Sequence, residues 1–272
     1  MTLSTREQQR LFKNYGTWAI VTGATSGIGL ELVTQLAEAG FSLILNARNE
    51  AALTQLAAKL QNQHPIQVRT VAADISDPAT IQRLLDITAD LPIGLLIASA
   101  GFGTSGPLID GTLADELAMV RVNCTSLLAV TYHFAQRFSE QGRGGIVLLS
   151  SLVAFQGVPY SANYAATKAY VQSLAEGLAR ELQPSGVSVL AAAPGPVKSG
   201  FGDRANMRMN MALTPQQVGI PILRALGRQT TVLPGLLTKL LTYSLRTVPR
   251  WAKIRIMEQV MGGMTQHQRT SV

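Results

Sequence analysis

A glycine-rich loop between a short strand and a helix constrains this chain more than any other feature of its sequence. Residues 17–22 are mostly apolar and lead directly into residues 23–29, which contain three glycines, and apolar side chains then recur at helical spacing from Leu30. In that context the glycines allow a tight turn, a close approach of the backbone to a phosphate group and close packing of the helix. The helix N-terminus then offers free amides and the positive end of its dipole to a pyrophosphate. The sequence therefore predicts a dinucleotide site at Gly23, Thr25, Ser26, Gly27, Ile28 and Gly29.

The alternation of strand and helix continues along the chain. Further strands are expected at 41–46, 68–72, 93–98, 146–149, 187–192 and 230–233, with helices over 51–62, 77–89, 112–140, 161–182 and 214–226. Repeated strand–helix units of this length give a parallel sheet with helices on both faces. The chain has 272 residues, 47% of them hydrophobic, a size that suits one large core. We therefore expect a single α/β domain over residues 1–272, with a doubly wound, Rossmann-type sheet of about seven strands.

The end of the second predicted strand indicates which dinucleotide is bound. An acidic residue that binds a ribose 2′-hydroxyl is expected about 20 residues beyond the glycines, near Ala47. No carboxylate stands there, and Arg48 follows instead. A guanidinium beside that ribose suits a 2′-phosphate, so the sequence favours NADP(H) over NAD(H). The alternative is that Arg48 is a solvated arginine at a helix start.

Three polar side chains follow the predicted strand at 146–149. Ser151 comes just after this strand, and Tyr164 and Lys168 lie four residues apart, so they share one face of the helix over 161–182. A free phenol has a pKa of about 10 and exchanges protons poorly near neutrality. A nearby ammonium stabilises the phenolate and lowers that pKa. Tyr164 could then exchange a proton with an alcohol or ketone, while the Ser151 hydroxyl holds the carbonyl oxygen.

Taken together, these motifs resemble the short-chain dehydrogenase/reductase family over residues 15–200. Beyond the glycine loop, the matching positions are Asp74 and Ile75 for the adenine pocket, Ser99, Ala100 and Gly101 after the fourth strand, Asn123, Ser151, Tyr164 and Lys168 for the catalytic tetrad, and Pro194, Gly195, Val197 and Ser199 for the nicotinamide-side loop. The resemblance implies an oxidoreductase that transfers hydride between a nicotinamide and a carbonyl or secondary alcohol. It also implies homodimers or homotetramers built on the helices at 112–140 and 161–182.

The same resemblance gives each member of the tetrad a role. Tyr164 is then the general acid in reduction and the general base in oxidation, and Lys168 holds the nicotinamide ribose and lowers the pKa of Tyr164. Both Tyr164 and Lys168 are also expected among the coenzyme-binding residues. Ser151 orients the substrate carbonyl, and Asn123 fixes a water that connects Lys168 to solvent. The alternative for Asn123 is a buried helix residue bonded only to the backbone. No metal is expected in the site.

Two segments depart from the family pattern. The family usually has Asn-Asn-Ala-Gly after the fourth strand, whereas residues 98–101 are Ala-Ser-Ala-Gly, and Ser199 replaces the usual threonine. The first change removes carboxamides that support the adenosine edge of the site, and the second keeps the hydroxyl. Residues 15–22 resemble the branch that contains hydroxysteroid dehydrogenases and long-chain 3-oxoacyl-CoA reductases. That similarity implies a bulky, apolar ketone or a 3-oxoacyl group as the substrate.

The basic character of the chain is confined to its last quarter. From Arg204 onward there are ten basic residues and one acidic residue, whereas residues 1–203 carry a slight negative charge. We expect residues 200–272 to form a substrate lid and a basic helical extension. Leu236, Leu237, Leu240, Leu241 and Leu245 share one face of a predicted helix over 235–246, and Arg250, Lys253 and Arg255 lie on a second helix that starts at Pro249. Such a pair either packs on the enzyme or its dimer partner, or meets an anionic membrane or acyl carrier.

Composition excludes several classes of protein. A single cysteine, Cys124, excludes an internal disulfide framework and fits a reducing, cytoplasmic compartment. No signal sequence or membrane span is predicted, although peripheral contact with a membrane stays open. Nucleic acid is disfavoured as a partner, because no recognition motif accompanies the basic charge. The alternative function is a coenzyme-binding regulatory or structural subunit with little turnover.

Overall fold

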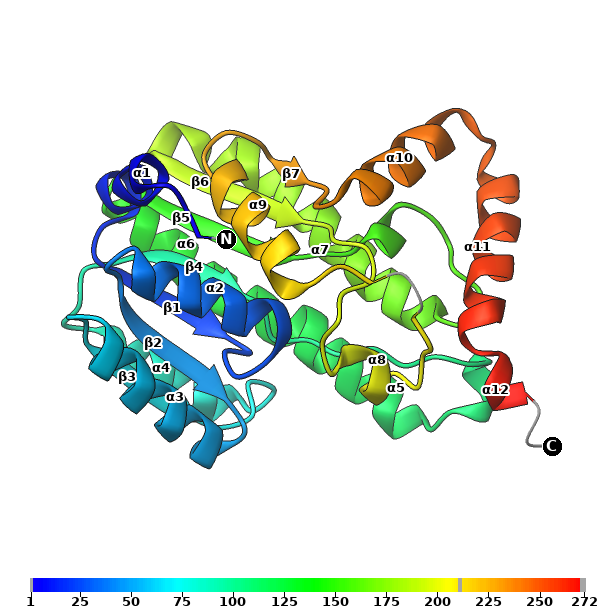
Figure 1. The fold of residues 1–272 in the computed structure, drawn as a ribbon, viewed down its shortest axis with the longest axis horizontal. Helices are drawn as coiled ribbons and strands as arrows, with labels where there is room; N and C mark the ends of the chain where they lie inside the picture. Colours follow the sequence, from blue (N-terminus) through cyan, green and yellow to red (C-terminus); the bar gives the residue numbers. More distant parts are fainter. Residues whose placement is uncertain (1, 210–211, 270–272) are drawn as a thin grey trace.

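The computed structural model describes residues 2–209 and 212–269 and is built on a seven-stranded parallel sheet (Figure 1). The strands are β1 (Trp18–Thr22), β2 (Ser42–Ala47), β3 (Val68–Ala72), β4 (Ile93–Ala98), β5 (Gly144–Leu149), β6 (Val187–Ala192) and β7 (Thr231–Val232). Their order across the sheet is β3-β2-β1-β4-β5-β6-β7. The direction of winding therefore reverses between β1 and β4, and ligands of such sheets bind outside the carboxyl ends of the strands at this point. The predicted doubly wound sheet is confirmed.

Helices cover both faces of the sheet. On one face lie α1 (Thr5–Tyr15), α2 (Gly27–Glu38), α3 (Glu50–Gln63) and α9 (Pro215–Ala225), and on the other lie α4 (Pro78–Thr88), α6 (Leu127–Glu140) and α7 (Ala162–Glu181). Neighbouring strand residues belong to different cores: Val21 packs with the first group of helices and Ile20 with the second. Burial on both faces explains why the central strands are continuous apolar runs without polar alternation.

The helix predicted over 112–140 is interrupted near its middle. A wider, π-type turn at Arg121–Ser126 separates α5 (Leu113–Val120) from α6, and Asn123 lies in it. Single π turns inside α-helices are frequent at functional sites, because the extra residue redirects the side chains around it. This interruption was not predicted, since the apolar stripe continues on both sides of the turn.

The C-terminal helices stand away from the sheet (Figure 1). They are α8 (Phe201–Arg204), α10 (Leu236–Ser244), α11 (Arg250–Met264) and α12 (Gln266–Arg269). The inner face of α11 packs on the main body through Met257 and Met261, which are buried with Val158 and Ala165. The predicted helical extension is therefore present, and one of its faces contacts the segment that carries Tyr164.

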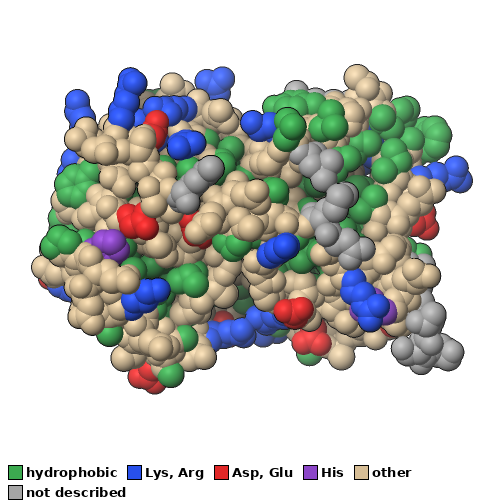
Figure 2. All heavy atoms as spheres, in the orientation of Figure 1, with side chains coloured by type: hydrophobic (Ala, Val, Ile, Leu, Met, Phe, Trp, Pro, Cys, Tyr) green, Lys and Arg blue, Asp and Glu red, His purple; other side chains and the backbone are tan. Residues whose placement is uncertain are grey.

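The outer face of α10 and α11 does not pack on the rest of the chain. Leu236 is 84% exposed, Leu240 64% and Trp251 65%, so these two leucines do not pack on the core of their own chain, whereas packing on a dimer partner stays a prediction. The side chain of Leu237 lies outside the described residues. Figure 2 shows hydrophobic side chains gathered over these two helices, at the upper right of the molecule. Among the described residues, no helix has the length and apolar character needed to cross a membrane.

Candidate active site

The glycine loop after β1 has a backbone shape suited to a phosphate group. Gly23 and Gly27 have φ angles of +66° and +55°, which glycine adopts without strain. A Cβ atom on Gly29 would lie 2.2 Å from the Gly23 carbonyl oxygen, so only glycine fits where α2 begins. Within the described residues, no side chain caps the first turn of α2. Its amides are therefore available to a pyrophosphate.

The loop after β4 is held by a side chain of β1. The Thr22 hydroxyl accepts hydrogen bonds of 3.1 Å from the backbone amides of both Ser99 and Ala100. At the carboxyl ends of β2 and β3, the Asn46 carboxamide donates to the carbonyls of Val71 and Ala73 and so joins these two strands. Sequence reasoning missed both side chains. The available signal was a polar residue at the end of an otherwise apolar strand.

Most of the predicted coenzyme residues line a single large cavity. Among the described positions, the exceptions are Thr25, Asp74 and Ile75. Asp74 accepts a 2.8 Å hydrogen bond from the Ser76 amide. Burial raises the pKa of Asp74, but the hydrogen bonds from Ser76 and the charges of Arg48 and Arg204 outweigh it and hold that pKa below its usual value. Asp74 thus lies outside the cavity lining, but it is close enough to Arg48 and Arg204 for both charges to stabilise its carboxylate.

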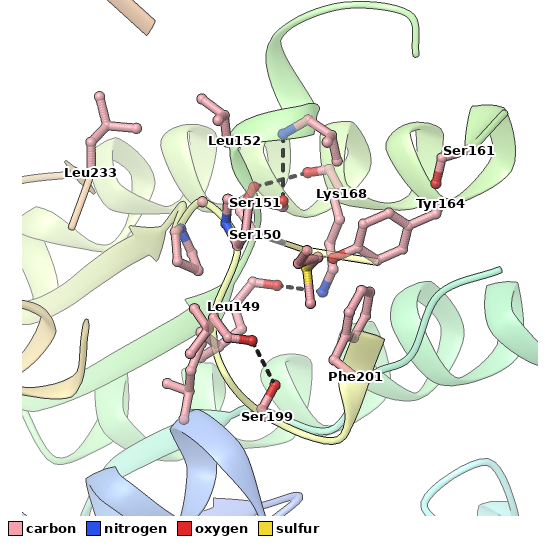
Figure 3. Close-up of a pocket in the computed structure, with 18 of the residues that line it drawn as sticks. Leu149, Ser150, Ser151, Leu152, Ser161, Tyr164, Lys168, Ser199, Phe201 and Leu233 are labelled. Atoms are coloured by element: carbon pink, nitrogen blue, oxygen red, sulfur yellow. Dashed lines mark hydrogen bonds between the residues drawn. The ribbon is translucent and has the colours of Figure 1, made fainter. Parts of the chain in front are cut away.

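Ser151, Tyr164 and Lys168 meet at the carboxyl end of β5 (Figure 3). Tyr164 and Lys168 occupy successive turns of α7, and the Lys168 Nζ lies 5.8 Å from the centre of the Tyr164 ring. The same Nζ donates a 2.7 Å hydrogen bond to the Leu149 carbonyl, at the end of β5. The Ser150 hydroxyl donates to the Lys168 carbonyl at 3.1 Å. Strand and helix are therefore fixed to each other beside the two side chains.

Asn123 is fully buried behind Gly101. Its carboxamide accepts a hydrogen bond from the Phe102 amide and donates to the Phe102 carbonyl and to the Thr167 hydroxyl. A Cβ atom on Gly101 would lie 3.0 Å from the Asn123 Oδ1 and 3.4 Å from the Lys168 Nζ. Asn123 and Lys168 therefore border the same glycine, and the bonds of Asn123 go to both backbone and side chain.

The pKa of Tyr164 shifts in the direction opposite to the one predicted. Burial raises it to about 12, and the hydrogen bond with Ser151 offsets only part of this rise. The Lys168 ammonium lies near the face of the phenol ring and bonds to a carbonyl, and burial lowers its own pKa to about 8. The phenol is therefore protonated throughout the neutral range, which is the form that a general acid requires.

The cavity extends from the glycine loop to the C-terminal helices and has a volume of about 1350 Å³. On the side away from the glycine loop, its lining includes Phe155, Phe201, Ile256, Met257, Met261 and Met264. The Phe201 ring lies 5.2 Å from the Tyr164 ring, centre to centre. This geometry offers a proton donor at the junction of a dinucleotide crevice and a wide apolar chamber. The lid region was predicted, but Phe201 within it was not.

The loop that follows β6 lines the crevice and lies close to the glycine loop. The Pro194 carbonyl accepts a 2.9 Å hydrogen bond from the Leu152 amide, and the Ser199 hydroxyl donates to the Val197 carbonyl at 3.4 Å. A Cβ atom on Gly27 would lie 2.9 Å from the Ser199 Cβ, so this loop approaches the glycine loop closely. Pro194, Gly195, Val197 and Ser199 all line the cavity, as predicted.

Comparisons with known proteins agree with this geometry. The model of the short chain dehydrogenase family matches residues 17–210. A 7beta-hydroxysteroid dehydrogenase of Mediterraneibacter gnavus is 28% identical over 238 residues, which cover 83% of this chain and 88% of that protein. A very-long-chain 3-oxoacyl-CoA reductase of Podospora anserina is 34% identical over 185 residues, covering 66% of this chain and 54% of the fungal protein. The structure of a short-chain dehydrogenase from Sphingobium yanoikuyae in complex with NADPH has a TM-score of 0.79 and 30% identity, covering 84% of this chain and 92% of that one. The first two names belong to the branch that residues 15–22 resemble.

Proposed function

The chain belongs to the short-chain dehydrogenase family, and on that basis we propose that it is an NADP(H)-dependent reductase of bulky, apolar ketones or 3-oxoacyl compounds. Its reaction class, the oxidation and reduction of CH–OH and C=O groups, is that of its relatives. The observation that carries the proposal is the position of Ser151, Tyr164 and Lys168 between the glycine loop and the apolar chamber. Residues on both sides of position 200 line this cavity, which supports one catalytic domain with residues 200–272 as its lid and extension.

The residues of the crevice fit an NADP(H) molecule. The uncapped first turn of α2 suits the pyrophosphate, and Arg48 suits the 2′-phosphate. Lys168 is then the residue for the nicotinamide ribose, and the Ser199 hydroxyl for the nicotinamide carboxamide. When bound, the coenzyme supplies the hydride. The Sphingobium relative described with NADPH supports this choice of coenzyme.

Tyr164 delivers the proton of the reduction. The carbonyl carbon accepts hydride, the carbonyl oxygen takes the phenol proton, and the C=O group becomes CH–OH while Tyr164 is left as a phenolate. The Lys168 ammonium then stabilises that phenolate, and the Ser151 hydroxyl donates to the carbonyl oxygen as charge develops on it. The phenolate regains its proton by way of Lys168, along a path that passes Gly101 and Asn123.

The choice of coenzyme can be tested at Arg48. Replacing Arg48 by alanine is expected to weaken NADPH binding by about 10- to 100-fold, because one charge-assisted contact with the 2′-phosphate is lost. NADH lacks that phosphate, and its affinity should stay nearly unchanged. Fluorescence titration of both coenzymes measures this, with Arg83→Ala, an exposed arginine of α4, as the matched control. Equal losses for both coenzymes would contradict a role at the 2′-phosphate.

The rate of reduction should fall as the pH rises through about 8. Burial lowers the pKa of Lys168 to about 8, so above this pH the amine loses the charge that stabilises the phenolate. The pKa of Tyr164 is about 12, so the phenol itself stays protonated across the same range. We expect kcat/KM for NADPH, which reports the free enzyme, to drop by about tenfold per pH unit above pH 8. Lys168→Arg keeps its charge and should move the fall to higher pH, whereas a profile of the wild type that is flat to pH 10 would sink this assignment.

A second copy of the chain is the proposed partner of α6 and α7. Leu128 and Tyr132 on α6 and Tyr170 on α7 are large apolar or aromatic side chains that are 37–57% exposed. Their position on the two helices that the family uses for assembly supports a homodimer or homotetramer.

An anionic lipid surface is the proposed partner of α10 and the outer face of α11. Exposed Leu236, Leu240 and Trp251 lie beside Arg250 and Arg255, which are exposed as well. Apolar side chains with neighbouring cations are typical of helices that lie in a membrane interface. A second copy would place like charges opposite each other on this face, which disfavours it as the occupant.

Charge reversal on these helices should abolish the lipid contact. We expect a variant with Arg250 and Arg255, the exposed cations of this face, replaced by glutamate to lose binding to phosphatidylserine vesicles in a flotation assay, because the attraction to anionic lipid is reversed. Pure phosphatidylcholine vesicles are the control, and the rate of reduction of a water-soluble ketone should not change. Undiminished binding of the variant would rule out an electrostatic lipid contact, and failure of the wild type to bind either vesicle would leave the acyl carrier as the partner.

A further inference from the structure

Arg204 of the lid helix α8 lines the same crevice as Arg48. Its guanidinium carbon lies 3.8 Å from the centre of the Phe102 ring, directly after Gly101 in the β4 loop. Arg204 and Arg48 both line the large cavity. Two cations that come from elements 156 residues apart in the sequence therefore face the same crevice.

Among the described residues, neither guanidinium forms an ion pair. Within residues 2–209 and 212–269, no ion pair within 4.0 Å and no side-chain hydrogen bond is formed by Arg48 or Arg204. Burial lowers the pKa of Arg204 and the charge of Arg48 lowers it further, while Asp74 and Asp115 act in the opposite direction. Arg48 is thus close enough to repel Arg204, and an anion bound between them would relieve that repulsion.

The position of Arg204 connects the crevice to the catalytic tyrosine. α8 begins at Phe201, whose ring packs on Tyr164, and ends at Arg204, whose guanidinium lies on Phe102. A Cβ atom on Gly103 would lie 2.7 Å from the Phe201 ring, so the lid rests closely on the β4 loop at this point. An anion bound by Arg204 would hold α8, which is a single helical turn, in its position over Tyr164.

We propose that Arg204 is a second phosphate-binding residue of the coenzyme site, which holds the lid helix α8 over a phosphate group of the bound dinucleotide. The proposal rests on the proposed NADP(H) function. Arg204 belongs to the lid helix, so binding of the coenzyme and the position of this helix are coupled. The phosphate is either the 2′-phosphate or the pyrophosphate, and both offer the same anionic oxygens to a guanidinium.

Binding measurements on the full chain test the proposal without any substrate. NADPH and NADH are titrated into the wild type, Arg204→Met, Arg204→Lys and the control Arg83→Ala, which removes the same charge from an exposed site on α4. Methionine keeps an apolar stem over Phe102 and removes the charge, so the fold of the lid is preserved. We expect Arg204→Met to weaken NADPH binding by about 10- to 100-fold and Arg204→Lys to recover part of the loss.

The two coenzymes distinguish the two phosphates. A loss for NADPH alone assigns Arg204 to the 2′-phosphate, and an equal loss for NADH assigns it to the pyrophosphate; either result supports the proposal. Wild-type affinity of Arg204→Met for both coenzymes overturns it, as does an equal loss in Arg83→Ala. A wild type that binds both coenzymes but reduces no ketone would refute the proposed reaction while leaving the role of Arg204 standing. A wild type that binds neither coenzyme would overturn both.

Discussion

Replacing Tyr164 by phenylalanine is expected to lower kcat/KM for ketone reduction by about 100- to 10,000-fold, because the substitution removes the proton that the product oxygen needs. The ring itself remains, so its contact with Phe201 and the shape of the cavity should persist. NADPH affinity is therefore expected to stay nearly unchanged. Steady-state reduction of a panel of bulky ketones, followed by the loss of NADPH absorbance, gives the first quantity, and fluorescence titration gives the second.

Tyr170→Phe is the matched control for this experiment. Tyr170 lies on the same helix, α7, but is 37% exposed, and it does not line the cavity among the described residues. Its replacement removes only the hydroxyl and keeps the ring that the proposed subunit contact would use, so both kcat/KM and coenzyme affinity should stay at the wild-type values. Undiminished turnover in Tyr164→Phe would show that another group supplies the proton.

Gly29→Ala is expected to abolish coenzyme binding and to lower the free energy of unfolding by about 1–3 kcal/mol. The added Cβ atom would lie 2.2 Å from the Gly23 carbonyl oxygen and 3.0 Å from the Ser99 hydroxyl oxygen. The nearest atom belongs to the backbone, so the loop itself must move. The movement widens the turn that would hold the pyrophosphate. Urea unfolding and NADPH titration measure the two effects.

Gly263→Ala makes the same chemical change where there is room for it. Apart from its chain neighbours and the backbone of its own helix, no heavy atom of the described structure lies within 4 Å of a Cβ atom at Gly263, which is in α11. Alanine favours a helix interior over glycine, so this variant should be as stable as the wild type or slightly more stable. If Gly29→Ala behaves like Gly263→Ala in both measurements, the loop does not have the tight geometry described above.

The fold could be predicted because its determinants are local in the sequence. The strand at 93–98 is a continuous apolar run, and the helix over 161–182 carries its own apolar stripe, so each element can be assigned without its neighbours. A parallel sheet with helices on both faces then follows from the rules for strand–helix units, whereas the order of the strands comes from the structure alone. The π turn at Asn123 could not be predicted, because one extra residue in a helix leaves the apolar pattern almost unchanged.

The placement of the candidate residues relative to one another could be predicted, but their electrostatics could not. The spacing of Tyr164 and Lys168 places them on one helix face, and the structure confirms this arrangement. The spacing does not fix where the Lys168 ammonium points. In the structure this ammonium bonds to the Leu149 carbonyl, so burial is the dominant influence on the pKa of Tyr164. Phe201 and Arg204 were missed for a related reason. Their roles come from tertiary contacts with Tyr164 and Phe102, which lie far from them in the sequence.

Deuterium transfer tests whether Tyr164 protonates a carbonyl oxygen while a coenzyme bound in the neighbouring crevice transfers hydride to the carbonyl carbon. A bulky ketone is reduced in ordinary water with NADPH that carries deuterium at both C4 positions of the nicotinamide, and the alcohol is examined by mass spectrometry and NMR. We predict one deuterium on the carbinol carbon for each NADPH consumed, and none when Tyr164→Phe replaces the wild type over the same time. Consumption of NADPH that leaves ordinary hydrogen on that carbon would contradict this mechanism of reduction. No consumption with any ketone would also contradict it and would favour a coenzyme-binding subunit without turnover.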